Sequence, residues 1–338
     1  MSQRYAQVLV LAGFLAGCGG NPFLPDEPSE EPANPVEQLP GTEKPSASKS
    51  ITRYEAREDG NGNGYAENIT YDAENDTFSV DNLGFDGDNL YRRGMAVASL
   101  GPYRVYEASE VVEDPYSHRM IPQFEHRLLA GVSDSGKTSF AIVRTGAYMD
   151  YGFGGFVMKR EGGVNLPSSG QAGYLGDYAA IQDAKGASGL RYVTGQAQVA
   201  IDFADFNDGD AVQGAIYNRQ IFDVNGNDIT AAVIGQLNDE FNPDRIGGND
   251  ISELPVLSFR VGPGAIDANG EIRGMVDSFL VDYGSGGAQV VTYETGNYYA
   301  IIAGENAEEI VGIIVVESAD PYFDNVTVRE TGGFIAYR

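Results

Sequence analysis

The sequence predicts a mostly β protein with one inserted helix. The chain has 338 residues, among them 44 Gly, 20 Tyr and 16 Phe and no Trp. Glycine and tyrosine suit short strands that are joined by tight turns. Apolar and polar residues alternate over many short segments, which is the pattern of half-buried strands. Roughly 290 residues follow the N-terminal region, enough for one large or two medium domains.

The first residues have the features of a secretory signal. Arg4 supplies a positive charge, and the apolar segment 6–15 is shorter than the ~20 residues that a membrane-spanning helix needs. Residues 15–18 read Leu-Ala-Gly-Cys, which resembles the lipobox of bacterial lipoproteins. We therefore predict that residues 1–17 are a signal peptide, removed by cleavage before Cys18.

Cys18 is the only cysteine of the sequence, so no disulfide can form within the chain. We predict that its thiol carries diacylglycerol; the alternative is an ordinary signal peptide beside an incidental cysteine. One acyl chain anchors a protein only marginally, at about 0.8 kcal/mol per buried methylene, whereas the two or three chains of a bacterial lipoprotein make attachment effectively permanent. Gly19 follows the cysteine, and the absence of an aspartate there favours the outer membrane.

Residues 18–50 are predicted to be the lipidated cysteine and an acidic, proline-rich linker. Proline removes backbone donors and favours extended conformations, and like charges repel one another. Such a segment is expected to bury no core and, at about 3 Å per residue, to hold the body tens of Å from the membrane. Its regularly spaced prolines are Pro22, Pro25, Pro28, Pro32, Pro35, Pro40 and Pro45.

Two hairpins are expected in the first half of the body, because apolar and polar residues alternate on both sides of a polar turn. The first hairpin consists of residues 68–71 and 77–80, and the second of residues 127–132 and 139–144.

Gly, Pro and Ser cluster at residues 161–170 without periodicity, which indicates a domain boundary. We predict an N-terminal β domain at residues 51–162 and a C-terminal β domain at residues 163–338. The strands expected in the second domain are at 173–181, 189–204, 211–218, 255–262, 271–282, 288–294, 297–303, 310–317 and 325–337.

One segment of the second domain has helical instead of strand periodicity. Apolar residues recur at helical spacing from Asp228 to Phe241, and Asp228 or Thr230 is suited to cap the helix. We therefore predict a helix inserted between strands. Further along, Asn269-Gly270 lies between two apolar runs and predicts a type I′ turn.

Four segments of the second half resemble the C-terminal barrel of transferrin-binding protein B-like surface lipoproteins. A Gly-Tyr strand at 173–178 precedes an alternating strand at 195–203 and a glycine-containing return strand at 212–219, and residues 309–316 resemble the closing strand. The resemblance implies an eight-stranded antiparallel barrel that follows an N-terminal handle domain on a lipidated anchor. It also implies a surface position and binding of a host protein, but no ligand residue carries over.

The chain departs from this family in two places. The predicted helix near 229–241 is extra, and a hairpin at 326–335 follows the expected closing strand. With the resemblance, the predicted fold class is all-β, with two β domains, the C-terminal one an eight-stranded antiparallel barrel with an inserted helix.

The charge balance limits the classes of partner that the protein is expected to bind. The formal net charge is −27, which argues against nucleic acid, because phosphate contacts need Lys and Arg. It also argues against electrostatic attraction to anionic lipid. We interpret the charge as a source of solubility; the alternative is a basic partner or divalent cations.

Residues 131–138 read Gly-Val-Ser-Asp-Ser-Gly-Lys-Thr and match the Walker A pattern. A P-loop needs a helix after it, so that backbone N–H groups and the helix dipole face the phosphates. Here residues 139–143 have the composition of a strand, so we interpret residues 133–137 as the tip of a hairpin. Lys137 is accordingly expected to be dispensable.

Two clusters of oxygen ligands, at residues 59–64 and 223–228, are of the kind that calcium favours. Neither has EF-hand spacing, and Asn-Gly pairs are typical of turns, so we interpret both as structural turns.

His118 and His126 are the only histidines. Glu113, Asp114 and Glu125 lie near them in sequence and are potential co-ligands of a transition metal, but we interpret both as surface histidines. A serine triad needs one of them as its base, and no such arrangement is compelling. A glycosidase-like pair cannot be selected from 49 acidic residues.

Tyrosines such as Tyr298-Tyr299 and those in residues 148–153 suit a binding surface or a barrel core, and we favour the structural role.

Together these features predict an outer-membrane lipoprotein, attached by lipid on Cys18, that acts as a surface binding or interaction module. We expect a monomer that binds an unknown protein or small molecule and no nucleic acid, with no enzyme activity, cofactor or metal. The alternatives are a periplasm-facing structural envelope lipoprotein and a lipid-anchored hydrolase that uses carboxylates.

Overall fold

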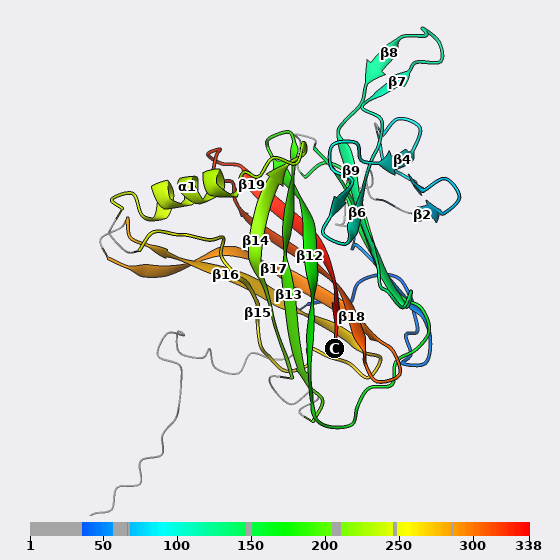
Figure 1. Ribbon diagram of the computed structural model, residues 1–338, viewed down its shortest axis with the longest axis vertical. Helices are drawn as coiled ribbons and strands as arrows, with labels where there is room; N and C mark the ends of the chain where they lie inside the picture. Colours follow the sequence, from blue (N-terminus) through cyan, green and yellow to red (C-terminus); the bar gives the residue numbers. More distant parts are fainter. Residues whose placement is uncertain are drawn as a thin grey trace, which may run out of the picture. The chain divides into compact units, whose positions relative to one another are not determined.

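β-Strands make up nearly all of the regular structure, as the alternating patterns predict. The computed structural model describes residues 36–56, 66, 68–84, 86–146, 151–204, 211–245, 249–284 and 287–338, and these contain strands β1 to β19 and helix α1. The strands form a nine-stranded sheet, a closed barrel and a two-stranded sheet (Figure 1). The predicted fold class, all-β with an eight-stranded barrel and an inserted helix, is confirmed.

The nine-stranded sheet is built from the first half of the chain. Its strand order is β1-β11-β10-β9-β6-β4-β3-β2, with β5 paired to β6, and all neighbours are antiparallel. Both predicted hairpins are present, as β2–β3 and β9–β10. The strands are β1 (Ile51–Tyr54), β2 (Ile69–Asp72), β3 (Thr77–Val80), β4 (Leu90–Arg93), β5 (Ser99–Leu100), β6 (Tyr103–Glu107), β9 (His126–Val132), β10 (Thr138–Thr145) and β11 (Gly154–Arg160).

The closed barrel is built from the second half of the chain, and it closes where its first strand pairs with its last. All eight strands are antiparallel to their neighbours. The strands are β12 (Gln171–Lys185), β13 (Leu190–Asp202), β14 (Val212–Asp223), β15 (Leu257–Phe259), β16 (Glu271–Asp282), β17 (Gln289–Ala303), β18 (Glu309–Ala319) and β19 (Thr327–Tyr337).

The inserted helix α1 (Thr230–Phe241) lies between β14 and β15 in the chain, as predicted. Val233 and Leu237, one turn apart, are buried in the barrel core, which explains the helical spacing of the apolar residues. Neither expected capping residue is the N-cap, because that position is Ile229, which makes no side-chain capping hydrogen bond. Asp228, one residue earlier, accepts a hydrogen bond from the backbone N–H of Thr230 at 2.8 Å. The hydroxyl of Thr230 instead accepts the backbone N–H of Ile221, which ties the helix to β14.

Two glycine-containing segments that were predicted as turns or breaks are continuous strand. The strands expected at 288–294 and 297–303 form the single strand β17, in which Gly296 pairs with Val276 and Val316. A Cβ atom at Gly296 would lie 2.0 Å from the carbonyl oxygen of Val315, so the glycine permits a close approach between strands.

The extra hairpin expected at residues 326–335 is also wrong, because these residues belong to β19, the eighth strand of the barrel. The pair Gly332-Gly333 resembles a turn but makes room for two aromatic rings. A Cβ atom would lie 2.1 Å from the hydroxyl oxygen of Tyr178 at Gly332, and 2.4 Å from the ring of Phe140 at Gly333.

The turn at Asn269-Gly270 has a different type from the one predicted. Gly270 has a φ of 79° and donates its N–H to the carbonyl of Asp267, but Asn269 is not among the described residues with positive φ. A type I′ turn needs positive φ at both central residues, so the prediction is wrong. The carboxylate of Asp267 instead accepts the N–H of Asn269 at 2.8 Å.

The linker prediction fails for residues 36–50, which pack on the body. Val36 and Leu39 are buried. The carbonyl of Ala47 accepts the N–H of Val164 at 2.6 Å, and the N–H of Thr42 donates to the carbonyl of Thr52 at 3.0 Å. Proline and charge favour extended chain, but an extended chain can still pair with a sheet edge when a few apolar side chains accompany it.

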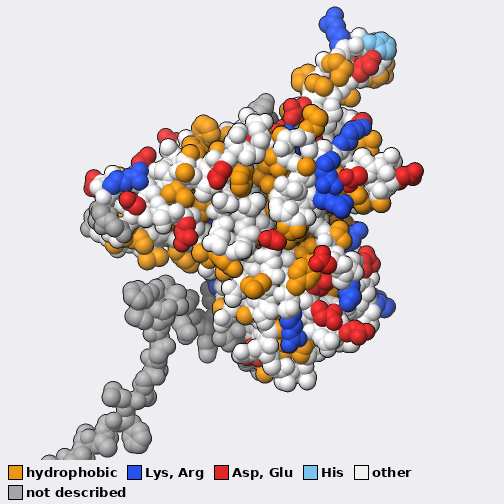
Figure 2. Space-filling view, viewed as in Figure 1, with side chains coloured by type: hydrophobic (Ala, Val, Ile, Leu, Met, Phe, Trp, Pro, Cys, Tyr) orange, Lys and Arg blue, Asp and Glu red, His pale blue; other side chains and the backbone are white. Residues whose placement is uncertain are grey.

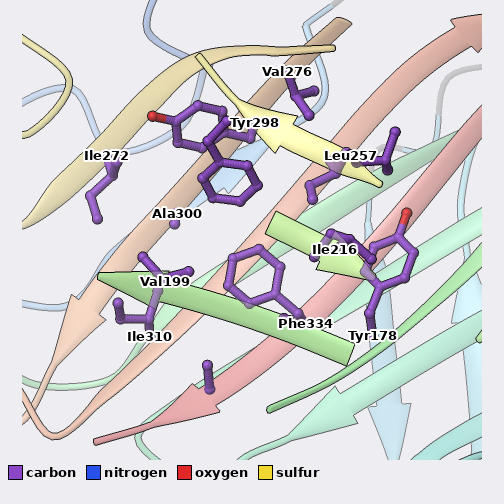
Figure 3. Packing of buried hydrophobic residues seen from close by; sticks show 14 of the residues in the cluster. Tyr178, Val199, Ile216, Leu257, Ile272, Val276, Tyr298, Ala300, Ile310 and Phe334 are labelled. Carbon is purple, nitrogen blue, oxygen red and sulfur yellow. The ribbon is translucent and has the colours of Figure 1, made fainter. Parts of the chain in front are cut away.

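Three apolar clusters hold the described residues together. One fills the barrel and includes the rings of Tyr298 and Phe334 (Figure 3); Tyr298 stacks on Phe259 with ring centroids 4.0 Å apart. A second joins one face of the nine-stranded sheet, through residues such as Phe140, to the outer face of the barrel, through residues such as Ile335. The third covers the other face of the sheet.

The strands β9, β10 and β11 are therefore buried on both faces. This shared core accounts for the compactness of the described residues, which fall within one unit. That residues 51–162 and 163–338 fold as separate domains stays a prediction.

Candidate functional site

A two-stranded hairpin stands apart from the other strands (Figure 1). It consists of β7 (Val111–Glu113), a turn and β8 (Met120–Pro122), and we call residues 111–122 the projecting hairpin. Its apolar side chains are largely in solvent, with Tyr116 93% and Met120 60% exposed, and Figure 2 shows hydrophobic side chains along it. Large exposed apolar side chains gathered on one element are typical of an interaction surface.

The turn of the projecting hairpin is ordered by its own polar residues. The carboxylate of Asp114 accepts the backbone N–H groups of Tyr116 and Ser117, at 2.8 and 2.7 Å. His118, with a φ of 53°, contacts the carboxylate of Glu113 through Nδ1 at 2.8 Å. The hairpin thus presents Tyr116 on a defined turn.

The base of the projecting hairpin is fixed to the sheet by a buried arginine. Arg127, on β9, donates to the carboxylates of Glu110 and Glu125 at 3.2 and 3.0 Å. The backbone N–H of Gln123 also donates to the carbonyl of Glu110 at 2.7 Å. These bonds hold the two ends of the hairpin beside each other.

The two histidines lie in different environments. His118 is exposed on the projecting hairpin, as expected, but His126 is fully buried at the start of β9, so its prediction as a surface residue is wrong. Burial lowers the pKa of His126 to about 4, and its Nε2 has no hydrogen-bond partner in the described part of the chain. The described residues contain no group of three or more potential metal-ligating His, Cys, Asp or Glu side chains.

The Walker A match is the tip of the β9–β10 hairpin, as interpreted from the sequence. Its hydroxyl groups point to one carboxylate of the barrel, that of Glu309 on β18. Ser133 and Thr138 donate to Oε1 of Glu309 at 3.0 and 2.9 Å, and Ser135 donates to Oε2 at 2.9 Å. We call Ser133, Ser135, Thr138 and Glu309 the hydroxyl clamp.

The lysine of the Walker A match takes no part in that cluster. Lys137 is partly exposed and pairs with Glu308 at 3.2 Å. The residues that would hold phosphate in a P-loop here bind a carboxylate, and the chain continues as a strand. This geometry supports a structural role for the motif.

Two carboxylates come together inside the barrel, the arrangement that the hydrolase alternative requires. Glu294 and Glu330 both accept from the guanidinium of Arg219, at 2.7 to 2.8 Å, and all three side chains are buried. Tyr178 donates to Glu330 at 2.7 Å, and Ser278 donates to Glu294 at 2.6 Å. With their oxygens engaged and buried, these carboxylates form a hydrogen-bonded cluster inside the barrel.

Buried arginines also join the sheet to the barrel. Arg144 on β10 pairs with Glu55 at 2.8 and 2.9 Å and donates to the hydroxyl of Thr331 on β19. Arg53 on β1 forms two bonds of 2.6 Å with Glu271 on β16. Each charged group has a partner of opposite sign, which lowers the free-energy cost of burial.

The remaining sequence candidates are structural where they are described. The carboxylate of Asp223 accepts the N–H groups of Asn225 and Asn227 at 2.9 Å, which makes residues 223–228 a turn. Tyr298 is buried in the barrel, and Tyr299 packs against the core between the sheet and the barrel. Cys18, residues 59–64 and residues 147–150 lie outside the described residues.

Sequence analysis did not find the projecting hairpin. Its strands have three residues each, β8 ends in a proline, and exposure removes the alternation that identifies half-buried strands. The available signal was a set of large apolar residues within a polar stretch, including Tyr116 and Met120.

Among the described residues, no helix is both long and apolar enough to cross a bilayer. In the comparisons with known proteins, no family model matches the chain and no curated protein matches its sequence.

Solved structures with a similar strand arrangement include transferrin-binding protein B. A mutant of that vaccine antigen from Haemophilus parasuis Hp5 has a TM-score of 0.37 and 12% identity, over 80% of this chain and 42% of the other. The intact Ap-TbpB, with N and C lobes, has a TM-score of 0.37 and 12% identity, over 80% and 43%. A surface lipoprotein has a TM-score of 0.28 and 12% identity, over 61% and 79%. The chain spans less than half the length of the two transferrin-binding proteins.

Proposed function

We propose that this protein is a lipid-anchored outer-membrane lipoprotein whose body acts as a binding module at the cell surface. The anchor is Cys18, exposed by cleavage after residue 17, and the binding surface is the projecting hairpin. The segment Leu-Ala-Gly-Cys directly after an apolar stretch supports the anchor.

The exposure of the projecting hairpin carries the binding part of the proposal. Tyr116 and Met120 are 93% and 60% exposed, on an element whose turn and base are both held by hydrogen bonds. An ordered aromatic side chain loses little conformational entropy on binding, so it contributes more of its buried area to affinity. The buried polar clusters of the described residues stabilise the core. The projecting hairpin is therefore the best candidate for recognition.

The test of binding uses a double variant, Tyr116→Ser with Met120→Ser, in the full-length protein in detergent. Met95→Ser is the matched control, because Met95 is 92% exposed and lies outside the hairpin. An external protein that is retained by the wild type and by Met95→Ser but lost by the double variant supports the proposal. Equal retention by all three proteins contradicts it.

The location is tested separately, with an antibody against the body applied to intact and to permeabilised cells. Labelling of intact cells supports a surface position. Labelling only after permeabilisation would move the body to the periplasmic side, and the structural envelope alternative would replace the surface module.

A further inference from the structure

A cavity of about 190 Å³ lies at one end of the barrel. It is formed where the turn after β12 and the loop before β19 meet, since Lys185 pairs with Thr327 at these ends. Neither the hydroxyl clamp nor the projecting hairpin contributes to it. The chemistry of its lining indicates which ligand it suits.

The inner wall of the cavity presents hydrogen-bond acceptors. Gln182 is 93% buried, its Nε2 donates to Glu330 at 2.9 Å, and its side chain lines the cavity. A carboxylate only accepts hydrogen bonds, so this contact fixes the orientation of the amide. The carbonyl oxygen of Gln182 has no hydrogen-bond partner in the part of the chain that the structure describes. This unpaired acceptor favours a ligand that donates.

Each charged residue of the lining has a partner of opposite sign. These residues are Asp183, Asp320 and Arg191. Arg191 pairs with Asp320, and Arg329 reaches Asp183 from outside the cavity at 2.9 Å. Burial nevertheless raises the pKa of Asp183, against the opposing effect of Arg329, so a further cation beside this carboxylate is favourable.

The outer rim of the cavity is aromatic. Tyr322 and Phe323 line it, and both keep a large part of their surface in solvent. Aromatic faces attract ammonium and guanidinium groups, and acceptors below an aromatic rim suit a cation on an apolar stem. The net charge of −27 also raises the local concentration of basic groups near the protein.

We propose that this cavity binds an alkylammonium or alkylguanidinium group, which donates to the carbonyl oxygen of Gln182 while its stem lies between Tyr322 and Phe323. The group belongs either to a lysine or arginine side chain of a basic protein or to a free small amine. The inference goes beyond the surface-module proposal, because it depends neither on the lipid anchor nor on the projecting hairpin.

The experiment titrates the full-length protein in detergent with butylammonium, with hexalysine peptide and with butanol, at constant ionic strength, by calorimetry. Butanol has the size of butylammonium without its charge. Ser188→Trp fills the cavity from an exposed turn residue of its lining. Phe323→Ala removes half of the rim, and Phe279→Ala is its matched control, since Phe279 is 51% and Phe323 59% exposed. Circular dichroism of each variant shows that it is folded.

We expect binding of butylammonium, of hexalysine or of both, and none of butanol. Ser188→Trp and Phe323→Ala are each expected to weaken binding about tenfold or more, and Phe279→Ala to leave it unchanged. Binding of the small amine identifies a free ligand as sufficient, and binding of hexalysine alone identifies a protein side chain. Unchanged binding in both cavity variants, or no binding of either cation, would overturn the inference and leave the surface-module proposal standing.

Discussion

Two hairpins in the first half of the chain differ in what their turns contact. The β9–β10 turn carries a complete Walker A sequence, and its three hydroxyls donate to Glu309 of the barrel. The projecting hairpin carries no known motif, and Tyr116 at its turn is almost completely in solvent. The first turn is bound to the barrel of the same molecule, whereas the second is available to contact another molecule.

This difference teaches that a motif predicts function only in its structural context. Serine, threonine and glycine suit phosphate binding when a helix follows them, and they suit a tight hairpin that binds a carboxylate when a strand follows them. Recognition surfaces, in turn, need no motif, because exposed aromatic area is sufficient. The predictions below test how firmly the first hairpin is held and how free the second one is.

The largest expected effect is on the hydroxyl clamp. Glu309→Ala leaves the hydroxyls of Ser133 and Thr138 buried without their acceptor and removes the acceptor of the exposed Ser135, and we expect the free energy of unfolding to fall by about 3 to 5 kcal/mol. Chemical denaturation measures this value. Glu308→Ala is the matched control, since that neighbouring carboxylate is exposed and pairs only with Lys137, so its effect should stay within about 0.5 kcal/mol. Equal effects of the two substitutions would contradict the clamp.

The base of the projecting hairpin is expected to respond to acid through His126. Its pKa is about 4 in the folded protein and about 6.5 in the unfolded chain, so between these values only the unfolded chain gains a proton. Stability should therefore fall as the pH decreases from about 6.5 to about 4, by up to about 3 kcal/mol from this residue.

His126→Gln should flatten this slope, and His118→Gln, on the exposed hairpin, should leave it as it is. The test measures the free energy of unfolding of the wild type and of both variants across this pH range and compares the three slopes. An unchanged slope in His126→Gln would show that burial of the neutral ring does not govern the acid response.

A smaller effect is expected at the lysine of the Walker A match. Lys137→Ala removes one solvent-exposed ion pair, so the free energy of unfolding should change by no more than about 0.5 kcal/mol. Calorimetry with ATP should detect no binding to either protein. Nucleotide affinity in the wild type that disappears in the variant would restore the P-loop interpretation.

The smallest effect on stability is expected at the projecting hairpin. Tyr116→Ser should change the free energy of unfolding by less than about 0.5 kcal/mol, because the side chain contacts mostly solvent. Thermal unfolding beside Met95→Ser provides the comparison. A clear loss of stability would mean that Tyr116 packs against the body and is not free to bind a partner.

Strand positions were predictable from the sequence wherever one face of a strand is buried, because burial produces alternation. The hairpin at 68–80 carried this alternation and the helix near 229–241 its own helical spacing, whereas the hairpin at 127–144, buried on both faces, was located by its polar turn. Glycines misled the prediction in β17 and β19. The backbone of a neighbouring strand or an aromatic ring lies very close to each of Gly296, Gly332 and Gly333. That strand or ring is far away in the sequence, so the local pattern does not reveal it.

For the candidate site, the sequence was enough to exclude a P-loop but not to predict which residues the structure brings together. The strand after Lys137 was enough to reject a P-loop, but nothing near residues 133–138 indicates Glu309, more than 170 residues later. His126 was mistaken for a surface residue because the adjacent stretch is polar, whereas its own strand runs through the core. The projecting hairpin was not predicted because its side chains are exposed, and exposure leaves no alternating pattern in the sequence.

The central claim is that the projecting hairpin faces the exterior of the cell while the β9–β10 turn is held in the molecule. Trypsin applied to intact cells tests both parts, because Arg119 lies on the exposed hairpin and Lys137 lies on the clamped turn. The account predicts early cleavage after Arg119, abolished in Arg119→Gln, with the bond after Lys137 resistant. Resistance of Arg119 until the outer membrane is opened, or cleavage after Lys137 at an equal rate, would contradict it.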